Sequence, residues 1–300
     1  MTNHRADTGK NEIVVVSIKA FGDLVIAVNC CLRARANFGD RLTILLGEHL
    51  VPLYQALGSP FPHRVVRHGS NQMPALFEMR QKGVVAAFRS AFALRHAISA
   101  AEIPPRARLL FDQRGIREAY VTSARPFNMV PAAGNIYLAY DSWLGTSTDA
   151  QYDNAGKSGP VRIFPGSRMS AKNLGIALIR NISALINAKG LSVELMVLDG
   201  ERPDLELSGL QHTVVPRQFQ AMIDAISGAG AVISADSMPA HIAEFVGRGA
   251  FVISPVANRY WLPRTSYLHQ WNSVFLEGAD SPRLAAFLDD ASSTVTQRAE

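Results

Sequence analysis

Cysteine is scarce in this sequence of 300 residues. There are two, Cys30 and Cys31, and they are adjacent. Neighbouring cysteines are poorly placed to crosslink distant parts of a fold or to share a metal ion, and the histidines do not fall at the spacing of zinc ligands. The sequence therefore predicts a protein with no disulfides and no metal site, in a reducing compartment.

Long apolar runs are also missing. A membrane span needs roughly 18 apolar residues without charge, and the nearest candidate, residues 84–101, is interrupted by Arg89, Arg95 and His96. The chain begins with MTNHRADTGKNE, a polar stretch that lacks the apolar core of a signal peptide. We therefore expect a cytoplasmic protein.

The usual nucleotide-binding and hydrolase signatures are absent as well. No G-x-G-x-x-G follows the first expected strand, which argues against a dinucleotide-binding dehydrogenase. The stretch from Gly166 to Lys172 has a lysine but lacks the second glycine of a P-loop. A G-x-S-x-G motif, which would indicate a hydrolase, is not present either.

Positive charge is concentrated in one part of the chain. The whole sequence has 30 Lys and Arg against 25 Asp and Glu, and the stretch from Arg64 to Arg125 has 11 basic residues against 4 acidic ones. Such an excess attracts phosphate, anionic lipid or nucleic acid. The alternative is a solvated surface without a partner.

The apolar pattern of the first half alternates between short strands and helices. Continuous apolar strands need cover on both faces, so a β-α-β opening of this kind predicts a parallel sheet. We expect strands at residues 13–18, 42–46, 109–111 and 119–122 and helices at residues 24–37, 49–57 and 73–101.

After a polar, Gly-rich stretch of linker composition at residues 145–160, the alternation restarts. Strands are expected at residues 161–164, 193–198, 213–215, 231–235 and 250–254, with helices at 174–189, 218–229 and 238–246. Alternation at this density predicts a doubly wound α/β fold. We expect two Rossmann-like domains facing a cleft, residues 1–155 and 156–300.

Gly22 and Asp23 follow the first expected strand, at the edge where open α/β sheets bind ligands. Gly22 allows a tight turn, and Asp23 would begin the next helix. Asp23 then either caps that helix by accepting backbone N–H bonds or serves the ligand site as a carboxylate.

A second segment, Pro165 to Lys172, lies between an expected strand and helix. A turn at Gly166, the hydroxyl of Ser167 and the cations of Arg168 and Lys172 suit a diphosphate at a helix entrance. A surface turn with solvated side chains is the alternative.

Two more segments lie at strand ends. The carboxylates of Asp199-Gly200-Glu201 can accept hydrogen bonds from ribose or sugar hydroxyls, and a simple polar turn explains them equally well. Asp236 or Ser237 can cap the following helix, whose N–H groups and positive dipole end would point to the ligand edge. His241 lies in or near the first turn of that helix.

Together these segments resemble glycosyltransferase family 9, the ADP-heptose:lipopolysaccharide heptosyltransferase family. IVVVSIKAFGDLVIAVNCCLRAR resembles that family's first strand, Gly-Asp turn and first helix, and FPGSRMSAK its Pro-Gly-x-x-x-x-x-Lys loop. ISADSMPAHIAEFVGRGAFVISP resembles its Asp-Thr-Gly-x-x-His-x-Ala segment and the following strand. The resemblance covers residues 13–57 and 161–263.

The sequence departs from the family at three places. The family's Asp-Thr-Gly is Asp236-Ser237-Met238 here, so a glycine that lets phosphate approach closely is replaced. Asn173-Leu174 stands where Trp-Pro commonly follows the lysine, and residues 62–150 match no part of the family. These departures leave the donor and the acceptor open.

The resemblance implies the B-type glycosyltransferase fold and an inverting transfer that uses no metal and no cofactor. The donor would be a nucleotide diphosphate sugar, with an ADP-sugar favoured. Asp23 would be the general base. The donor-binding residues would be Gly166, Ser167, Arg168, Lys172 and Ser237 at the diphosphate, Glu201 and Asp236 at the ribose or donor sugar, and His241 as a secondary candidate.

The basic stretch then suits an anionic glycan or glycolipid acceptor, such as lipopolysaccharide core, at the cytoplasmic face of the inner membrane. Nucleic acid is not an expected partner. Two other functions share this fold. One is a nucleotide-sugar 2-epimerase, which needs no acceptor, and the other is a catalytically silent protein that binds a nucleotide sugar.

Overall fold

The chain forms two compact units, each built around its own sheet. The computed structural model describes residues 12–67, 79–112, 126–147 and 159–296. The units are Met1–Ala132 with Ala139–Thr146, and Ala133–Leu138 with Ser147–Glu300. The expected domain boundary between residues 155 and 156 lies outside the described residues.

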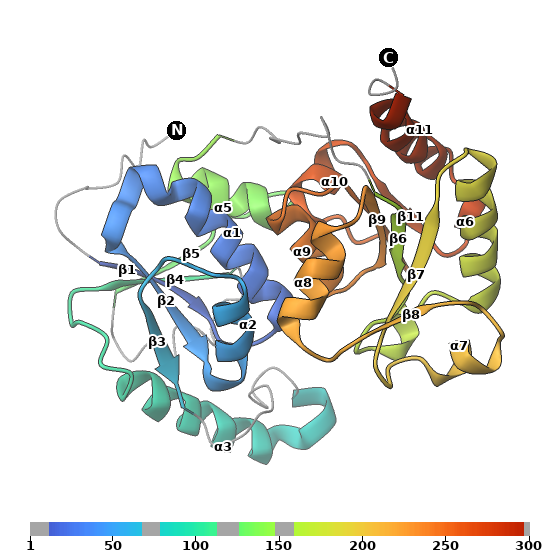
Figure 1. The fold of residues 1–300 in the computed structure, drawn as a ribbon. Helices are drawn as coiled ribbons and strands as arrows, with labels where there is room; N and C mark the ends of the chain where they lie inside the picture. The colour runs from blue at the N-terminus through green and yellow to red at the C-terminus, as the bar shows by residue number, and fades with distance from the viewer. Residues whose placement is uncertain (1–11, 68–78, 113–125, 148–158, 297–300) are drawn as a thin grey trace. The chain divides into compact units, whose positions relative to one another are not determined.

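The first unit contains a parallel sheet with strand order β3-β2-β1-β4-β5 (Figure 1). Its strands are β1 (Ile13–Ser17), β2 (Leu42–Gly47), β3 (His63–Val66), β4 (Arg108–Phe111) and β5 (Phe127–Met129). The run IVVVS of β1 is buried throughout, which fits its place in the centre of the sheet. Val14 pairs with Thr43 of β2 on one side and with Leu109 of β4 on the other.

Helices lie on both faces of this sheet. They are α1 (Phe21–Phe38), α2 (Val51–Ala56), α3 (Met79–Ser99) and α5 (Ile136–Leu144). Leu94 and Ile98 of α3 share a core cluster with Val14 and Val16, so α3 covers the face to which these valines point. The right-handed β1-α1-β2 connection places α1 on the opposite face, where it contacts β1 and β2.

The second unit contains a parallel sheet with strand order β11-β10-β9-β6-β7-β8. Its strands are β6 (Val161–Phe164), β7 (Val193–Leu198), β8 (Thr213–Val215), β9 (Ala231–Ala235), β10 (Ala250–Ser254) and β11 (Asn272–Val274). The strands β7, β6 and β9 are therefore neighbours, although β9 is far from β6 in sequence. The loops that follow these three strands meet at one edge of the sheet.

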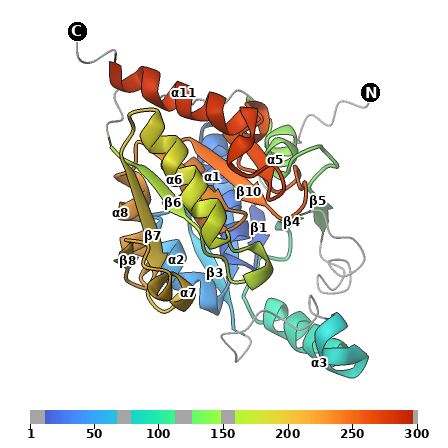
Figure 2. The ribbon, with the colours of Figure 1, turned by 90° about the vertical axis from the view of Figure 1, so that its right-hand side faces the viewer.

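Two helix pairs cover this second sheet. Ile179 and Ile182 of α6 (Ile176–Ala188) and Phe287 of α11 (Pro282–Thr296) share one core cluster with β6, and Figure 2 shows both helices in front of the sheet. On the other face, α8 (Phe219–Ser227) contacts α9 (Met238–Phe245), whose Ala240 packs on Val252 of β10. Short helices α7 (Pro203–Leu207) and α10 (Arg264–Leu268) complete the unit.

The expected doubly wound α/β class is confirmed, and the structure adjusts several elements. The helix expected at residues 73–101 is α3, within which Gly83 has a left-handed φ of 79°, so the continuous helix starts at Val84. The strand expected at 119–122 lies outside the described residues. No helix of the described residues is long and apolar enough to cross a membrane.

Candidate functional site

The loops after β6, β7 and β9 carry every donor-site residue expected from the sequence except His241, which lies in α9. Residues 165–173 follow β6, residues 199–202 follow β7, and Asp236 and Ser237 connect β9 to α9. The three strands are neighbours and parallel, so their carboxyl ends lie at the same edge. Contacts between these loops show that the structure brings the expected residues together.

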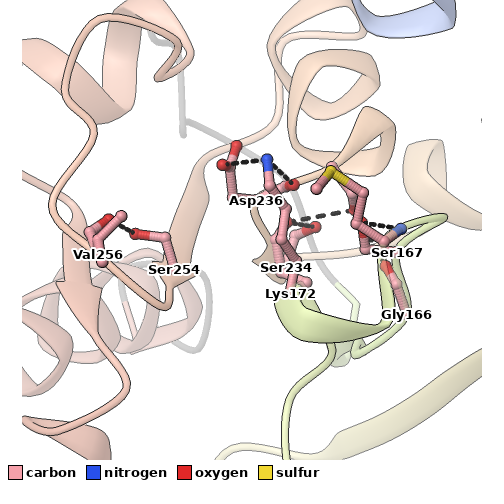
Figure 3. A network of polar contacts seen from close by, with 10 residues as sticks. Gly166, Ser167, Lys172, Ser234, Asp236, Ser254 and Val256 are labelled. Carbon is pink, nitrogen blue, oxygen red and sulfur yellow. Dashed lines mark hydrogen bonds and ion pairs between the residues drawn. The ribbon is translucent and has the colours of Figure 1, made fainter. Parts of the chain in front are cut away.

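The closest contact between the loops is an ion pair. Lys172 Nζ lies 2.6 Å from Asp236 Oδ2 and 3.4 Å from the Asp236 carbonyl oxygen (Figure 3). The Lys172 side chain keeps 29% of its surface exposed, whereas that of Asp236 keeps 13%. The ammonium is therefore positioned at the edge of the sheet and still reachable by a ligand.

Gly166 is enclosed by both neighbouring loops. Its carbonyl oxygen accepts a hydrogen bond from Ser237 Oγ at 3.1 Å. On the other side, a Cβ built at Gly166 would lie 2.6 Å from Cδ of Glu201. The Glu201 carboxyl group therefore packs directly against the Gly166 backbone and would have to move aside for any side chain at this position.

The loop after β6 is shaped by two residues that the sequence did not indicate. Asn173 Oδ1 accepts a hydrogen bond from the Ser167 amide at 2.8 Å. The buried guanidinium of Arg202 donates to the carbonyl oxygens of Pro165 at 3.1 Å and Leu174 at 3.0 Å. Arg202 therefore binds both ends of the loop. Arg202 also pairs with the nearby Asp204 carboxylate at 2.7 Å. Its contacts with the loop have no local sequence signal, because those partners are backbone atoms distant in sequence.

Ser167 and Arg168 lie on the open side of the same loop. Ser167 is half-buried, and its Oγ accepts a hydrogen bond from the Met169 amide at 3.3 Å. Arg168 is exposed. The expected contact of Arg168 with a diphosphate stays a prediction.

The expectation that the side chain of Asp236 or Ser237 caps α9 is wrong. Ser237 occupies the N-cap position of α9, but its side chain makes no capping hydrogen bond. Ser237 Oγ binds the Gly166 carbonyl instead, and Asp236 is paired with Lys172. The hydroxyl is used to join two loops, so the backbone N–H groups of the first turn of α9 have no side-chain cap.

His241 is buried beneath this edge. Its Nδ1 lies 3.1 Å from the hydroxyl of Tyr137, which the sequence did not indicate. Burial lowers the pKa of His241 to about 4, with Asp236 acting to raise it and Lys172 to lower it further. His241 is therefore a neutral ring near pH 7.

Tyr137 is itself held in place by polar neighbours. Its amide donates to Asn135 Oδ1 at 2.9 Å, and the guanidinium of Arg264 lies 5.2 Å from the centre of its ring. Arg264 is almost fully buried and pairs with Glu244 of α9 at 3.4 Å. These contacts restrain Tyr137, whose hydroxyl lies next to His241.

Glu201 has an altered acidity. Burial raises the pKa of the Glu201 carboxyl group, and the cations of Arg217 and Arg202 oppose the shift. The side chain is half-buried against Gly166. A carboxyl group in this place can accept hydrogen bonds from hydroxyls of a ligand.

In the first unit, Asp23 is the third residue of α1, whereas the sequence predicted that it would begin the helix. Helix α1 begins at Phe21, so Gly22 belongs to its first turn and does not form a separate tight turn. Ala20 is the N-cap residue. The interpretation of Asp23 as the cap is therefore wrong: Asp23 is a first-turn carboxylate, 21% exposed and 3.7 Å from Lys19 Nζ.

Two residues that the sequence did not indicate lie near Asp23. His49, just after β2, donates from Nε2 to the Lys19 carbonyl oxygen at 3.3 Å and packs edge-on against Phe21. Tyr140 of α5 is buried, and burial together with Asp112, Asp23 and the two cysteines raises the pKa of its hydroxyl well above the usual value. Neither residue belongs to a local motif, because His49 is 30 residues from its partner Lys19 and Tyr140 lies in α5, far along the chain from Asp23.

Among the described residues, no three His, Cys, Asp or Glu side chains lie close enough together to hold a metal ion. The expected metal-independent chemistry stays a prediction.

Comparison with solved structures identifies the fold. A family 9 glycosyl transferase from Veillonella parvula aligns with a TM-score of 0.58 at 12% identity, over 90% of this chain and 86% of that one. The ADP-heptose LPS heptosyltransferase II of Escherichia coli aligns with a TM-score of 0.56 at 11% identity, over 96% and 100%.

The Escherichia coli heptosyltransferase WaaC, solved with ADP-2-deoxy-2-fluoro heptose, aligns with a TM-score of 0.57 at 12% identity, over 93% of this chain and 99% of that one. No protein-family model and no curated protein matches the sequence. The three structural alignments show that the chain has the B-type glycosyltransferase fold. The resemblance to family 9 extends over the whole fold, at low sequence identity.

Proposed function

We propose that this protein is a nucleotide-sugar-dependent glycosyltransferase. The observation that carries the proposal is the junction of three loops, in which Lys172, Asp236, Ser237, Gly166 and Glu201 converge at the carboxyl edge of the second sheet. Ligands bind at this edge in open α/β folds. The fold shared with family 9 structures supports the same activity.

The donor diphosphate binds where a cation, a hydroxyl and the N-terminal end of α9 coincide. Lys172 exchanges part of its contact with Asp236 for a phosphate oxygen, and Ser167, Ser237 and Arg168 add donors. The positive dipole end of α9 faces the same charge. The donor is an ADP-sugar. Glu201 and Asp236 accept hydrogen bonds from hydroxyls of its ribose or of the sugar to be transferred.

The transfer step inverts the anomeric carbon and needs no metal ion. The acceptor hydroxyl oxygen bonds to the anomeric carbon while the bond from that carbon to the diphosphate oxygen breaks. Asp23 accepts the hydroxyl proton, and the nucleoside diphosphate leaves with the electron pair. Lys172 and the positive dipole end of α9 stabilise the charge that develops on the leaving group.

The acceptor is an anionic glycan or glycolipid such as lipopolysaccharide core, and the protein works in the cytoplasm. This part of the proposal is supported by the basic excess between Arg64 and Arg125. The similar structures include a lipopolysaccharide heptosyltransferase, which acts on an acceptor of this kind by its name.

A panel of sugar nucleotides tests the proposal. ADP-, GDP- and UDP-sugars are compared in a thermal-shift assay with a CMP-sugar, whose single phosphate serves as the control. We expect one diphosphate sugar to raise the melting temperature, and release of its nucleoside diphosphate to depend on an added acceptor glycan. Sugar isomerisation without acceptor would instead identify an epimerase, and binding without turnover a silent binding protein. No shift with any diphosphate sugar would contradict the proposal.

A further inference from the structure

Helix α3 exposes a row of large apolar side chains. Val84, Val85, Phe88 and Phe92 are 60%, 75%, 72% and 69% exposed, and we call these four residues the α3 stripe. Val84, Phe88 and Phe92 are spaced at intervals of four, so they lie on one side of the helix. Two phenylalanines one turn apart, both largely exposed, are unusual on a surface that contacts only water.

The α3 stripe is separate from the core contact of the same helix. Leu94 and Ile98 are almost fully buried and pack with Val14 and Val16 of β1. These residues already anchor α3, the teal helix in Figure 1, to the sheet. The stripe is therefore not needed to hold the helix in place. It is a second apolar face on a helix whose other face packs in the core.

Positive charge borders the α3 stripe. Arg89 is exposed and Arg95 is half-buried, and Met79–Ser99 contains no Asp or Glu. Arg89 and Arg95 lie three residues before and after Phe92, which places them on neighbouring turns. A helix that has these arginines beside its exposed phenylalanines and no acidic residue favours a partner with negative charge.

We propose that the α3 stripe docks the protein on an anionic lipid bilayer. A helix with phenylalanines on one side and arginines beside them lies in the membrane interface, its apolar side chains about 5–10 Å into the boundary of headgroups and acyl chains. The arginines then contact lipid phosphates. A second copy of the chain is a poor occupant, because two stripes packed together would bring their arginines face to face.

This inference does not rest on the proposed transferase activity. Vesicle binding is measured without donor or acceptor, so its failure would leave the sugar-transfer proposal intact, and the reverse is also true. Where both hold, α3 keeps the protein at the surface that contains a glycolipid acceptor.

Vesicle flotation of the full chain tests the docking surface. Wild type is expected to bind vesicles of phosphatidylcholine with phosphatidylglycerol and to bind phosphatidylcholine alone far more weakly. The double variant Phe88→Ser/Phe92→Ser should lose at least about tenfold in partition coefficient, and Arg89→Gln roughly fivefold. Leu207→Ser and Leu276→Ser remove leucines that are 91% and 98% exposed in the second unit, and they should bind as wild type does.

Equal melting temperatures for all variants would show that each is folded, because the altered side chains are exposed. Undiminished binding by the double variant would overturn the proposal, as would equal binding of wild type to neutral and anionic vesicles. A concentration-dependent dimer that the double variant abolishes would also overturn it, since the stripe would then be covered by a second copy.

Discussion

At the scale of single residues, Lys172 is the side chain on which the donor site most depends. Its ammonium is held 2.6 Å from Asp236 by an ion pair that joins the loops after β6 and β9. A cation positioned in this way loses little conformational entropy when a phosphate binds. The pair also explains why Asp236 is not a helix cap, although the sequence places it where a cap is expected.

Replacing Lys172 by alanine is expected to weaken binding of the nucleoside diphosphate by about 1–3 kcal/mol, the range for a charge-assisted hydrogen bond. Titration calorimetry measures the change. Lys189→Ala is the matched control, because Lys189 forms an ion pair with Asp289 in the same unit but on other elements. Unchanged affinity in Lys172→Ala would show that its ammonium does not contact the ligand.

Asp23→Asn is expected to lower turnover roughly 10²- to 10⁴-fold, the usual contribution of a positioned base. Donor affinity should not change, because the donor-binding loops are elsewhere in the chain. Asp23 is a first-turn residue and not a cap, so loss of its charge should cost only about 0.3–1 kcal/mol of stability. Asp40→Asn alters an exposed carboxylate of the same unit and serves as control. Normal turnover in a folded Asp23→Asn variant would remove Asp23 from the mechanism.

At the scale of elements, α9 connects the donor site to a buried polar group. Ser237 at its N-cap contacts Gly166, His241 in its first turn contacts Tyr137, and Glu244 near its end pairs with Arg264. These three contacts fix the N-terminal end of the short helix α9 at the ligand edge of the sheet. The sequence predicted this helix and its place at the ligand edge, but not the side chains that hold it.

The low pKa of His241, in α9, makes the stability of the folded protein depend on pH. Burial lowers its folded pKa to about 4 from 6.5, so between these values the unfolded chain binds a proton that the folded chain does not. Stability is therefore complete above about pH 6.5 and falls as the pH drops toward 4, by about 3 kcal/mol at most. Urea unfolding at several pH values should show a shallower fall in His241→Gln. Equal pH dependence of wild type and variant would contradict a buried neutral His241.

The elements that were predicted from the sequence and those that were missed differ in how clear their apolar pattern is. The strands β6, β7, β9 and β10 were predicted with the bounds that the structure shows, because each is a run of apolar, often β-branched residues between turns. Helix α1 starts at Phe21, three residues before its apolar pattern, since half-buried first-turn residues carry no periodicity. The edge strand β5 has three half-buried residues and no alternation, so it was missed, whereas the equally short edge strand β8 was predicted from its β-branched run TVV.

At the scale of the whole molecule, the fold class was predictable from the sequence, and the side-chain contacts that build the site were not. Alternating strands and helices imply parallel sheets wherever they occur, and ligands bind at the carboxyl edge. Glycines and polar residues at strand ends marked the loops. The roles of Arg202, Tyr137 and Asn173 in the site gave no signal, because the atoms that they contact there are distant in sequence or belong to the backbone.

The distribution of charge between the halves of the chain leads to the last prediction. Residues 156–300 have 13 basic and 13 acidic side chains, so the net charge of +5 comes from residues 1–155. Attraction between exposed charges is screened beyond about 8–10 Å at physiological ionic strength. Association with anionic vesicles or with an acidic acceptor glycan should therefore fall steeply as sodium chloride rises.

Nucleotide binding should fall less over the same salt series, because it depends on a few close contacts in the half without net charge. Flotation and calorimetry on one set of samples compare the two, with phosphatidylcholine vesicles as the uncharged control. A flat response of vesicle and acceptor binding to salt would mean that the basic residues between Arg64 and Arg125 are a solvated surface. Any binding that remained would then come from apolar contact alone, and the Phe88→Ser/Phe92→Ser variant would abolish it at every salt concentration.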